Sequence, residues 1–266
     1  MKKRFGQYLL TDKNYLEKII KSVSLNKDDV VLEIGSGTGL LTSKLAKQVK
    51  TVFACELERE ILKKLKENLK NQEITNVKII ESDFLKIDLE RLANKSFKII
   101  GNIPYNITSS ILLKLFGEMD KPALHLNMLE SVYLMLQKEV AERITANPGT
   151  KAYSPLSLLV QFFSKPTILF YVPRGAFVPV PKVDSAFVAL LPKKEHPKVN
   201  NPTLLKNIIR ISFQQRRKKL INSLNKLIKD KDLVIRTFDR LHLNQNLRAE
   251  NLSLEEYLKI SDTIYA

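Results

Sequence analysis

Residues 30–39 read VVLEIGSGTG, an apolar run that passes directly into a glycine-rich turn. A nearly continuous aliphatic run of this length is typical of a strand buried on both faces of a parallel sheet. Glycines at positions 35, 37 and 39 let the backbone of a strand-to-helix turn approach a ligand closely. The stretch therefore predicts the first strand, turn and helix of an α/β fold with a ligand at the turn.

The turn matches neither of the common phosphate-binding patterns. A P-loop ends in Gly-Lys-Ser or Gly-Lys-Thr, which is absent, and the dinucleotide fingerprint needs glycine or alanine where Leu40 stands. Glu33 precedes the turn, and its carboxylate is unsuited to a pyrophosphate but compatible with a cationic ligand. S-adenosylmethionine, which carries a sulfonium and an ammonium group, is such a ligand.

Short apolar runs alternate with amphipathic stretches around this turn, as they do in βαβ units. We expect four parallel strands at residues 30–34, 51–55, 77–80 and 97–100, with helices at residues 40–50 and 58–71. A fifth strand is expected within residues 131–137. Strands at residues 168–172 and 186–191 flank a proline-rich loop and should form a terminal pair.

Carboxylates follow the second and third expected strands. Glu56 lies 21 residues past Gly35, where a carboxylate can accept two hydrogen bonds from a ribose diol. Asp83 can accept from an adenine amino group, and Phe84 can cover the adenine face. The alternative is that both carboxylates only cap the following helices. Their order after successive strands favours a donor site that also includes Gly35 and Gly37 of the turn.

The fourth strand ends in Asn102-Ile-Pro-Tyr105, beside the expected donor site. An aromatic exocyclic amine is a poor nucleophile because its lone pair is delocalised into the ring. The Asn102 side-chain oxygen, with a backbone carbonyl held by Pro104, can accept both N–H bonds and favour attack on a methyl group. Tyr105 can stack on the base. The alternative is that Pro104 ends a strand and Tyr105 packs in the core.

The charge balance favours a polyanionic partner. Lys and Arg number 44 against 28 Asp and Glu, which gives a net charge of +16. Residues 193–266 carry 16 basic and 8 acidic residues, half of that net charge, and from residue 202 the pattern is helical. We therefore expect an α/β domain at residues 1–192 and a basic, all-helical RNA-contacting domain at residues 193–266. One polar stripe at helical spacing comprises Lys206, Arg210, Gln214, Arg217 and Lys218, with Arg216 and Lys219 alongside. From this region Arg210, Arg216, Arg217 and Lys218 are the expected phosphate contacts.

Other classes of site are not supported. Cys55 is the only cysteine, so neither an internal disulfide nor a cysteine-rich zinc site is possible. The histidines show no ligand spacing, so we expect no metal, and His125 is expected to pack in the core. Asp184 and Ser185 are expected to form a turn. No apolar segment is long enough for a signal peptide or a membrane span, so we expect a cytoplasmic monomer with no membrane partner.

The sequence resembles the ribosomal RNA adenine dimethyltransferase family, and within it the bacterial kasugamycin-sensitivity methyltransferases that act on the small subunit. The resemblance covers nearly the whole chain. Its motifs are KRFGQYLL at residues 3–10, EIGSGTG at 33–39, NIPY at 102–105, LQKEV at 136–140, the FxPxPxVDSA pattern at 177–186, FQQRRKKL at 213–220 and RAENL at 248–252.

The resemblance implies a Rossmann-like class I methyltransferase fold and S-adenosylmethionine as donor. It implies donor contacts at Tyr8, Leu10, Gly35, Glu56, Asp83 and Asn102. Tyr8 stands where the family more often has Asn or His, so its contact is expected through the backbone. Phe177 resembles the aromatic residue that covers the target base opposite Tyr105, and its alternative is a core position. The implied substrate is a pair of adjacent adenines near the 3′ end of small-subunit rRNA, with a role in subunit maturation.

Two other functions fit parts of this pattern. One is the related macrolide-resistance methyltransferase, which acts on large-subunit rRNA. The segments at residues 177–186 and 213–220 favour the small-subunit enzyme. The other is a non-catalytic RNA-binding assembly or transcription factor with a vestigial donor site. The presence of Gly35, Glu56, Asp83 and Asn102 argues against it.

Overall fold

The computed structural model describes residues 8–92 and 96–266, so residues 3–7 of the opening motif lie outside the described part. The chain divides into two compact units. The sheet unit comprises the chain up to Leu115, Ala123–Ala141 and Lys165–Pro192. The helical unit comprises Phe116–Pro122, Glu142–Ser164 and Lys193–Ala266. The helical unit therefore includes two segments that the sequence analysis assigns to the first domain, in addition to everything from Lys193 onward.

The sheet unit has the alternating strands and helices that the sequence predicts. Its elements in chain order are β1 (Leu9–Leu10), α1 (Lys13–Ser22), β2 (Val30–Ile34), α2 (Leu40–Ala46), β3 (Thr51–Glu56), α3 (Arg59–Asn71), β4 (Val77–Glu81), α4 (Leu89–Leu92), β5 (Phe97–Asn102), α5 (Thr108–Phe116), β8 (Leu129–Gln137), β9 (Ser164–Val172), β10 (Phe177–Val178) and β11 (Ser185–Pro192). Short 3₁₀ turns at Phe84–Lys86 (η2), Tyr105–Ile107 (η3), Leu124–Met128 (η4) and Arg174–Ala176 (η5) complete it. α6 (Lys138–Ile144) leads from this unit into the helical unit.

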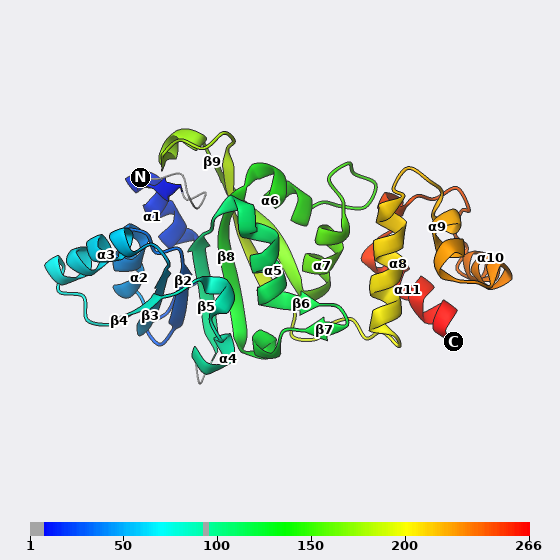
Figure 1. Ribbon diagram of the computed structural model, residues 1–266, viewed down its shortest axis with the longest axis horizontal. Coiled ribbons are helices and arrows are strands. Elements are labelled where there is room, and N and C mark those ends of the chain that lie inside the picture. Colours follow the sequence, from blue (N-terminus) through cyan, green and yellow to red (C-terminus); the bar gives the residue numbers. More distant parts are fainter. Residues whose placement is uncertain (1–7, 93–95) are drawn as a thin grey trace. The chain divides into compact units, whose positions relative to one another are not determined.

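Seven strands form one mixed sheet in the order β4-β3-β2-β5-β8-β11-β9 (Figure 1). The strands β4, β3, β2, β5 and β8 run parallel, and β11 is antiparallel to β8. All four predicted parallel strands, the fifth strand and the terminal pair are present. The chain passes from β2 outward to β4 and then returns to β5 on the other side of β2. Ligands of open α/β sheets bind at such a switch point, beyond the carboxyl ends of the strands.

α1 and α2 lie on one face of the sheet, because their apolar residues form one buried cluster with the strands. Leu16 of α1 and Leu41 of α2 belong to this cluster together with Val31, Ile100 and Phe187 of the strands. Side chains two apart on a strand share a face, so Asn102 lies on the same face as Ile100. The cluster thus supports the β2 and β5 ends at which the glycine turn and the Asn-Ile-Pro-Tyr segment begin.

α3 packs against β3 through buried aliphatic residues on one of its faces. Ile61, Leu62, Leu65 and Leu69 are buried, and the last three form a cluster with Ala54 of β3. Complete burial of an aliphatic side chain stabilises a fold by roughly 1.5–3 kcal/mol. This packing fixes the helix that starts at Arg59, shortly after Glu56 at the end of β3.

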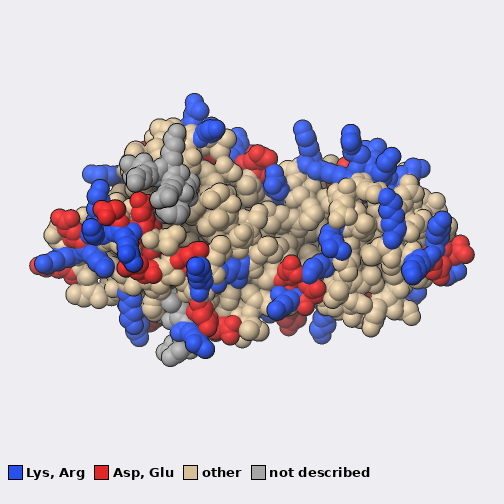
Figure 2. Space-filling model, in the orientation of Figure 1, with Lys and Arg blue, Asp and Glu red and all other residues tan. Residues whose placement is uncertain are grey.

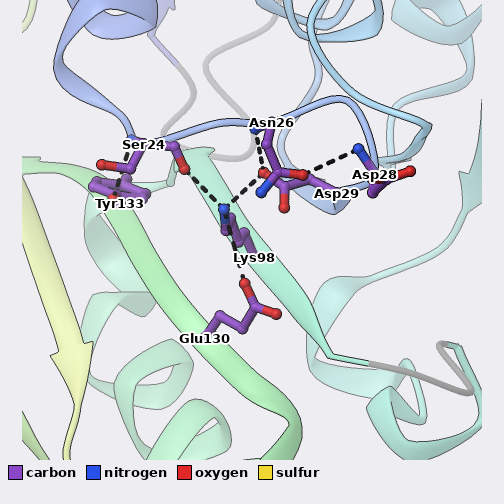
Figure 3. Close-up of polar contacts among 7 residues, drawn as sticks. All are labelled: Ser24, Asn26, Asp28, Asp29, Lys98, Glu130 and Tyr133. Carbon is purple, nitrogen blue, oxygen red and sulfur yellow. Dashed lines mark hydrogen bonds and ion pairs between the residues drawn. The ribbon is translucent and has the colours of Figure 1, made fainter.

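A buried ion pair joins the amino ends of β2 and β5 (Figure 3). Lys98 Nζ lies 2.7 Å from Asp29 Oδ2 and donates a hydrogen bond of 2.8 Å to the backbone carbonyl of Ser24. The backbone N–H of Asn26 donates to the same Asp29 oxygen at 2.7 Å. Glu130 is a more distant partner of Lys98, at 3.8 Å. This network lies at the end of the sheet opposite the glycine turn, so we assign it to stability.

The helical unit is built from helices and one short hairpin. Its elements are β6 (Gly117–Glu118), β7 (Lys121–Pro122), α7 (Pro155–Phe163), α8 (Pro202–Gln214), α9 (Leu220–Leu227), α10 (Lys231–Arg240), η6 (Ala249–Asn251) and α11 (Leu254–Tyr265). Leu205, Ile208 and Ile209 of α8 are buried, as are Leu220 and Leu224 of α9. These residues form the apolar side of the helices, as the helical pattern from residue 202 requires.

One detail of the predicted helical pattern is wrong. The basic stripe expected at residues 206–219 needs one uninterrupted helix, but α8 ends at Gln214 and α9 begins at Leu220. The backbone N–H of Leu220 donates to the carbonyl of Leu247 at 2.7 Å, which anchors the start of α9. Arg216, Arg217 and Lys218 therefore lie in a turn between two helices and do not continue the α8 stripe.

No helix within residues 8–92 and 96–266 is long and apolar enough to cross a membrane. Within the same residues, no group of His, Cys, Asp or Glu side chains could hold a metal ion. His125 is buried, and its Nε2 lies 3.1 Å from the carbonyl of Leu115. Desolvation by burial lowers the pKa of His125, which fits the expected core position.

Candidate active site

The glycine turn after β2 needs the conformational freedom of glycine. Gly35 has φ of 71° and Gly37 has φ of 56°, values that residues with a Cβ rarely adopt. A Cβ on Gly35 would lie 3.1 Å from the backbone oxygen of Asn102 at the end of β5. The turn and the Asn-Ile-Pro-Tyr segment are therefore direct neighbours at the switch point of the sheet.

Glu56 connects the end of β3 to this turn. The side chain is 2% exposed, and its Oε2 accepts a hydrogen bond of 3.0 Å from the backbone N–H of Gly37. Its Oε1 accepts from the backbone N–H groups of Leu57 and Glu58, at 2.8 and 3.0 Å. The carboxylate thus holds the start of α3 and the glycine turn in one arrangement.

A cavity of about 230 Å³ lies beside Glu56. Cys55 and Glu56 border it from the end of β3, and Asp83 and Phe84 border it from the segment after β4. Gly35, Pro104 and Asn106 close it on the β2 and β5 side. The cavity brings together Gly35, Glu56 and Asp83, three of the residues that the sequence assigns to the donor.

Asp83 also caps the turn that follows it, which is the alternative role considered for it from the sequence. Its Oδ1 accepts a hydrogen bond of 2.9 Å from the backbone N–H of Leu85 and so caps η2. Lys114 of α5 supports the same turn from outside, because its Nζ donates to the carbonyls of Leu85 and Ile87 at 3.1 and 2.7 Å. The role of Lys114 could not be predicted from the sequence, because it depends on contacts between segments far apart in the chain.

A second, smaller cavity lies on the other side of Gly35. It is bordered by Leu10, Glu33, Gly37 and Asn102, among others. Glu33 is 2% exposed, and Thr42 Oγ1 donates to its Oε2 at 2.5 Å. Burial raises the pKa of Glu33 to about 8, although the hydrogen bond from Thr42 opposes that shift. The Glu33 carboxyl group is thus buried beside this cavity, and its proton affinity is raised.

Asn102, Tyr8 and Tyr105 are linked by direct contacts beside the glycine turn. Asn102 Nδ2 donates a hydrogen bond of 2.6 Å to the backbone carbonyl of Tyr8. The rings of Tyr8 and Tyr105 lie with their centroids 5.2 Å apart. The Tyr105 hydroxyl lies 2.5 Å from Ser185 Oγ. Desolvation by burial raises the pKa of Tyr105.

Two of these contacts were missed in the sequence. Ser185 was assigned with Asp184 to a turn, and Asp184 Oδ1 does accept from the backbone N–H of Arg174 at 3.0 Å. Ser185 itself begins β11 and is completely buried. The backbone carbonyl of Tyr8 accepts the hydrogen bond from Asn102, and the donor contact expected through the Tyr8 backbone stays a prediction. Neither pairing can be read from sequence spacing, because they join residues 80 and 94 positions apart.

Phe177 is buried in the core. The side chain has no exposed surface, belongs to the cluster that contains Leu10 and Phe187, and lies on β10, which pairs with β1. Phe177 therefore occupies a core position, which the sequence analysis considered as the alternative to a base-stacking role. Phe177 could cover a base only after its ring left this packed position. Its predicted stacking role is therefore not supported by this conformation.

The basic residues that the sequence analysis assigns to RNA contact fall into two groups. Arg210 on α8 and Arg217, Lys218 and Lys219 in the following turn are exposed. Figure 2 shows Lys and Arg side chains gathered above α8 and α9 in this view, with few acidic side chains among them.

Lys206 and Arg216 instead have acidic partners. Lys206 Nζ pairs with Glu118 and with Asp120. Arg216 Nε lies 3.4 Å from Glu250 Oε2, and its Nη2 donates to the carbonyl of Thr150 at 3.2 Å. The predicted stripe is therefore only partly available to phosphate, and Arg216 serves first to hold the segment around Thr150.

The chain is similar to known proteins of one family. Residues 1–265 match the family described as ribosomal RNA adenine dimethylase. The chain is 39% identical over 269 residues to the ribosomal RNA small subunit methyltransferase A of Acaryochloris marina, covering 99% of this chain and 97% of the relative. A dimethyladenosine transferase from Plasmodium falciparum has a similar structure, with a TM-score of 0.79, 30% identity and 95% of both chains covered. The 23S rRNA methyltransferase ErmE gives a TM-score of 0.76 at 25% identity, covering 97% of this chain and all of that one.

Proposed function

Because the chain belongs to the ribosomal RNA adenine dimethylase family, we propose that it transfers methyl groups from S-adenosylmethionine to two adjacent adenines near the 3′ end of small-subunit rRNA. The protein is an S-adenosylmethionine-dependent rRNA adenine methyltransferase. The proposal adds the small subunit as its partner, a role in subunit maturation, a monomeric state and a cytoplasmic location. The observation that carries it is the contact between the glycine turn at Gly35 and Asn102, which supports placing donor and acceptor sites side by side.

The described residues fit the donor. The 230 Å³ cavity combines apolar walls with the buried Glu56 carboxylate and with Asp83. Glu56 would accept hydrogen bonds from the ribose diol, and Asp83 would accept one from the adenine amino group with Phe84 against its face. Gly35, Gly37 and Leu10 would border the amino-acid part, near the buried Glu33. When bound, S-adenosylmethionine supplies an electrophilic methyl group.

The acceptor chemistry rests on Asn102. Its amide nitrogen is occupied by the Tyr8 carbonyl, so its oxygen is the atom left to accept a hydrogen bond from an exocyclic amine. The carbonyl of Ile103, held by Pro104, is the second acceptor. Acceptors fixed in advance at this nitrogen favour the tetrahedral geometry of the reacting amine and need no reorganisation during the reaction. Tyr105 stacks on the base, and no general base is required, because the cationic amine formed loses its proton to water.

The RNA contacts are assigned to exposed cations of the helical unit. Arg210, Arg217 and Lys218 have the exposure that phosphate contacts need. Arg216 is assigned an indirect role, because Glu250 and the Thr150 carbonyl already occupy its guanidinium. Recognition would rest on these phosphate contacts and on a few unpaired bases.

The small subunit is favoured over the large subunit by the comparisons. The relative named as a small-subunit enzyme shares 39% of its residues with this chain, whereas ErmE, named for 23S rRNA, shares 25%. ErmE nonetheless has a similar fold, with a TM-score of 0.76, so fold alone does not decide between the two substrates.

A direct assay compares the possible substrates. The protein is incubated with radiolabelled S-adenosylmethionine and either undermethylated small subunits, mature methylated small subunits or protein-free large-subunit RNA. We expect label only in the undermethylated small subunits, at two adjacent adenines. Label in the large-subunit RNA alone would assign the macrolide-resistance activity instead. No label in any substrate would favour the non-catalytic RNA-binding alternative.

A further inference from the structure

Ser185 makes a contact with the acceptor side of the site that the sequence did not predict. Its Oγ lies 2.5 Å from the hydroxyl of Tyr105, 80 residues away in the chain. Ser185 is the first residue of β11 and has no exposed surface. Tyr105 begins η3 directly after Pro104. The hydrogen bond therefore joins the Asn-Ile-Pro-Tyr segment to a strand of the central sheet.

The sheet itself does not require a hydroxyl at this position. Ser185 pairs with Gln137 of β8 through the strand backbone, which alanine would serve equally well. A buried hydroxyl costs free energy unless it is hydrogen-bonded, and Tyr105 supplies that partner. Ser131 on β8 provides a comparison, since it is 5% exposed and its Oγ has no hydrogen-bond partner.

The Tyr105 ring is restrained at two places. One side of the ring contacts Tyr8, at a centroid distance of 5.2 Å and an interplanar angle of 32°. The hydroxyl end is held by Ser185. Tyr8 in turn accepts the hydrogen bond from Asn102 through its carbonyl. A continuous set of contacts therefore runs from Asn102 through Tyr8 and Tyr105 to Ser185.

We propose that Ser185 is a positioning residue for methyl transfer, which fixes the Tyr105 ring at the angle needed to stack on the target base. This inference rests on the proposed function. Ser185 would not touch the substrate, because it is buried behind Tyr105. Its effect is on preorganisation: a stacking ring that is already oriented holds the base in a reactive position more of the time.

The test uses Ser185→Ala, Tyr105→Phe, the double variant, and Ser131→Ala as a matched buried control. Turnover is measured with undermethylated small subunits, and donor affinity is measured by calorimetry. Each hydroxyl deletion should lower kcat about 3- to 10-fold, the rate equivalent of one lost hydrogen bond. The donor dissociation constant and the KM for the donor should stay within twofold, roughly the precision of such measurements.

Coupling between the two residues separates positioning from a general loss of stability. The double variant should be no slower than the slower single variant, because both substitutions remove the same hydrogen bond. Ser185→Thr keeps the hydroxyl and should retain more activity than Ser185→Ala. Ser131→Ala should have wild-type kcat.

Three results would overturn the proposal. They are wild-type kcat for Ser185→Ala, a double variant whose loss is the product of the two single losses, and an equal loss for Ser131→Ala. If Asn102→Ala is inactive while Ser185→Ala is normal, the proposed function stands and only the role of Ser185 is wrong. If the wild-type protein itself transfers no methyl group, the proposed function and this inference both fall.

Discussion

The side-chain nitrogen of Asn102 donates a hydrogen bond of 2.6 Å to the backbone carbonyl of Tyr8. This contact fixes the orientation of an amide whose two ends differ in chemistry, since the nitrogen donates and the oxygen accepts. Asn102 ends β5, and its backbone oxygen lies against Gly35 of the glycine turn. Asn102 therefore lies between the glycine turn and the Tyr8–Tyr105 ring pair, which is the geometric basis of the proposed reaction.

Glu56→Ala should weaken binding of S-adenosylmethionine by about 1.5–3 kcal/mol, the free energy typical of hydrogen bonds to a charged group. The substitution also releases the N–H of Gly37, which Glu56 holds at 3.0 Å. Glu81→Ala is the matched control, because Glu81 lies opposite Glu56 in the sheet register but is exposed and pairs with Arg59. Calorimetry should show weaker binding for Glu56→Ala alone. Unchanged donor affinity would exclude Glu56 from the ribose site.

Glu33 should make stability depend on pH. Its pKa in the fold is raised to about 8 from 4.5, so between these values the folded protein holds a proton that the unfolded chain has lost. Stability should therefore fall as pH rises from about 4.5 to about 8. Glu33→Gln removes this dependence while keeping an acceptor for Thr42.

This prediction is checked by measuring thermal or denaturant unfolding of the wild-type protein and of Glu33→Gln between pH 5 and pH 8. Since one pKa unit corresponds to about 1.4 kcal/mol, Glu33→Gln should gain at least that much relative stability across this range. Parallel stability curves for the two proteins would show that Glu33 is ionised in the fold.

Lys98→Met should destabilise the protein by about 3–5 kcal/mol, because it leaves Asp29 buried without its cationic partner. The exposed pair Lys63–Glu60 is the control, and Lys63→Met should change stability by less than about 0.5 kcal/mol. Denaturant unfolding measures both. Donor affinity should not change, since Lys98 lies at the amino end of the sheet. A loss below about 1 kcal/mol for Lys98→Met would contradict the assigned role.

Arg210→Ala with Arg217→Ala should weaken binding to small subunits, and the slope of log affinity against log salt should become shallower by roughly one to two units. Arg236→Ala with Arg240→Ala removes the same charge from exposed positions on α10 and should leave the slope closer to that of the wild type. Filter binding across a salt series compares the two. Wild-type affinity and slope for the first pair would mean that these arginines only face solvent.

The strands of the sheet could be predicted because each one is a short apolar run that is recognisable from its own residues. Residues 30–34 match β2, and the other expected strands differ from β3, β4 and β5 by no more than two residues at their ends. The position of Glu56 relative to Gly35 was also predictable, because parallel strands end at one edge of the sheet. Those regularities depend on neighbours in sequence and on sheet geometry alone.

Some features could not be predicted from the sequence, because they join segments far apart in the chain or depend on where a helix ends. Ser185 and Tyr105 meet because β11 inserts next to β8, which no local pattern specifies. The break between α8 and α9 was missed because residues 213–220 keep a helical spacing of apolar residues. Phe177 was assigned to the base from its motif, yet the pairing of β10 with β1 buries it.

The most direct test of the account compares Asn102→Ala with the wild-type protein in two measurements on the same samples. Donor binding is measured by calorimetry, and single-turnover methyl transfer is measured with undermethylated small subunits. Loss of an acceptor that acts mainly in the transition state should lower the transfer rate by about 100-fold or more. Donor affinity should change far less, because the cavity beside Glu56 remains. A near-normal transfer rate in Asn102→Ala would contradict the account.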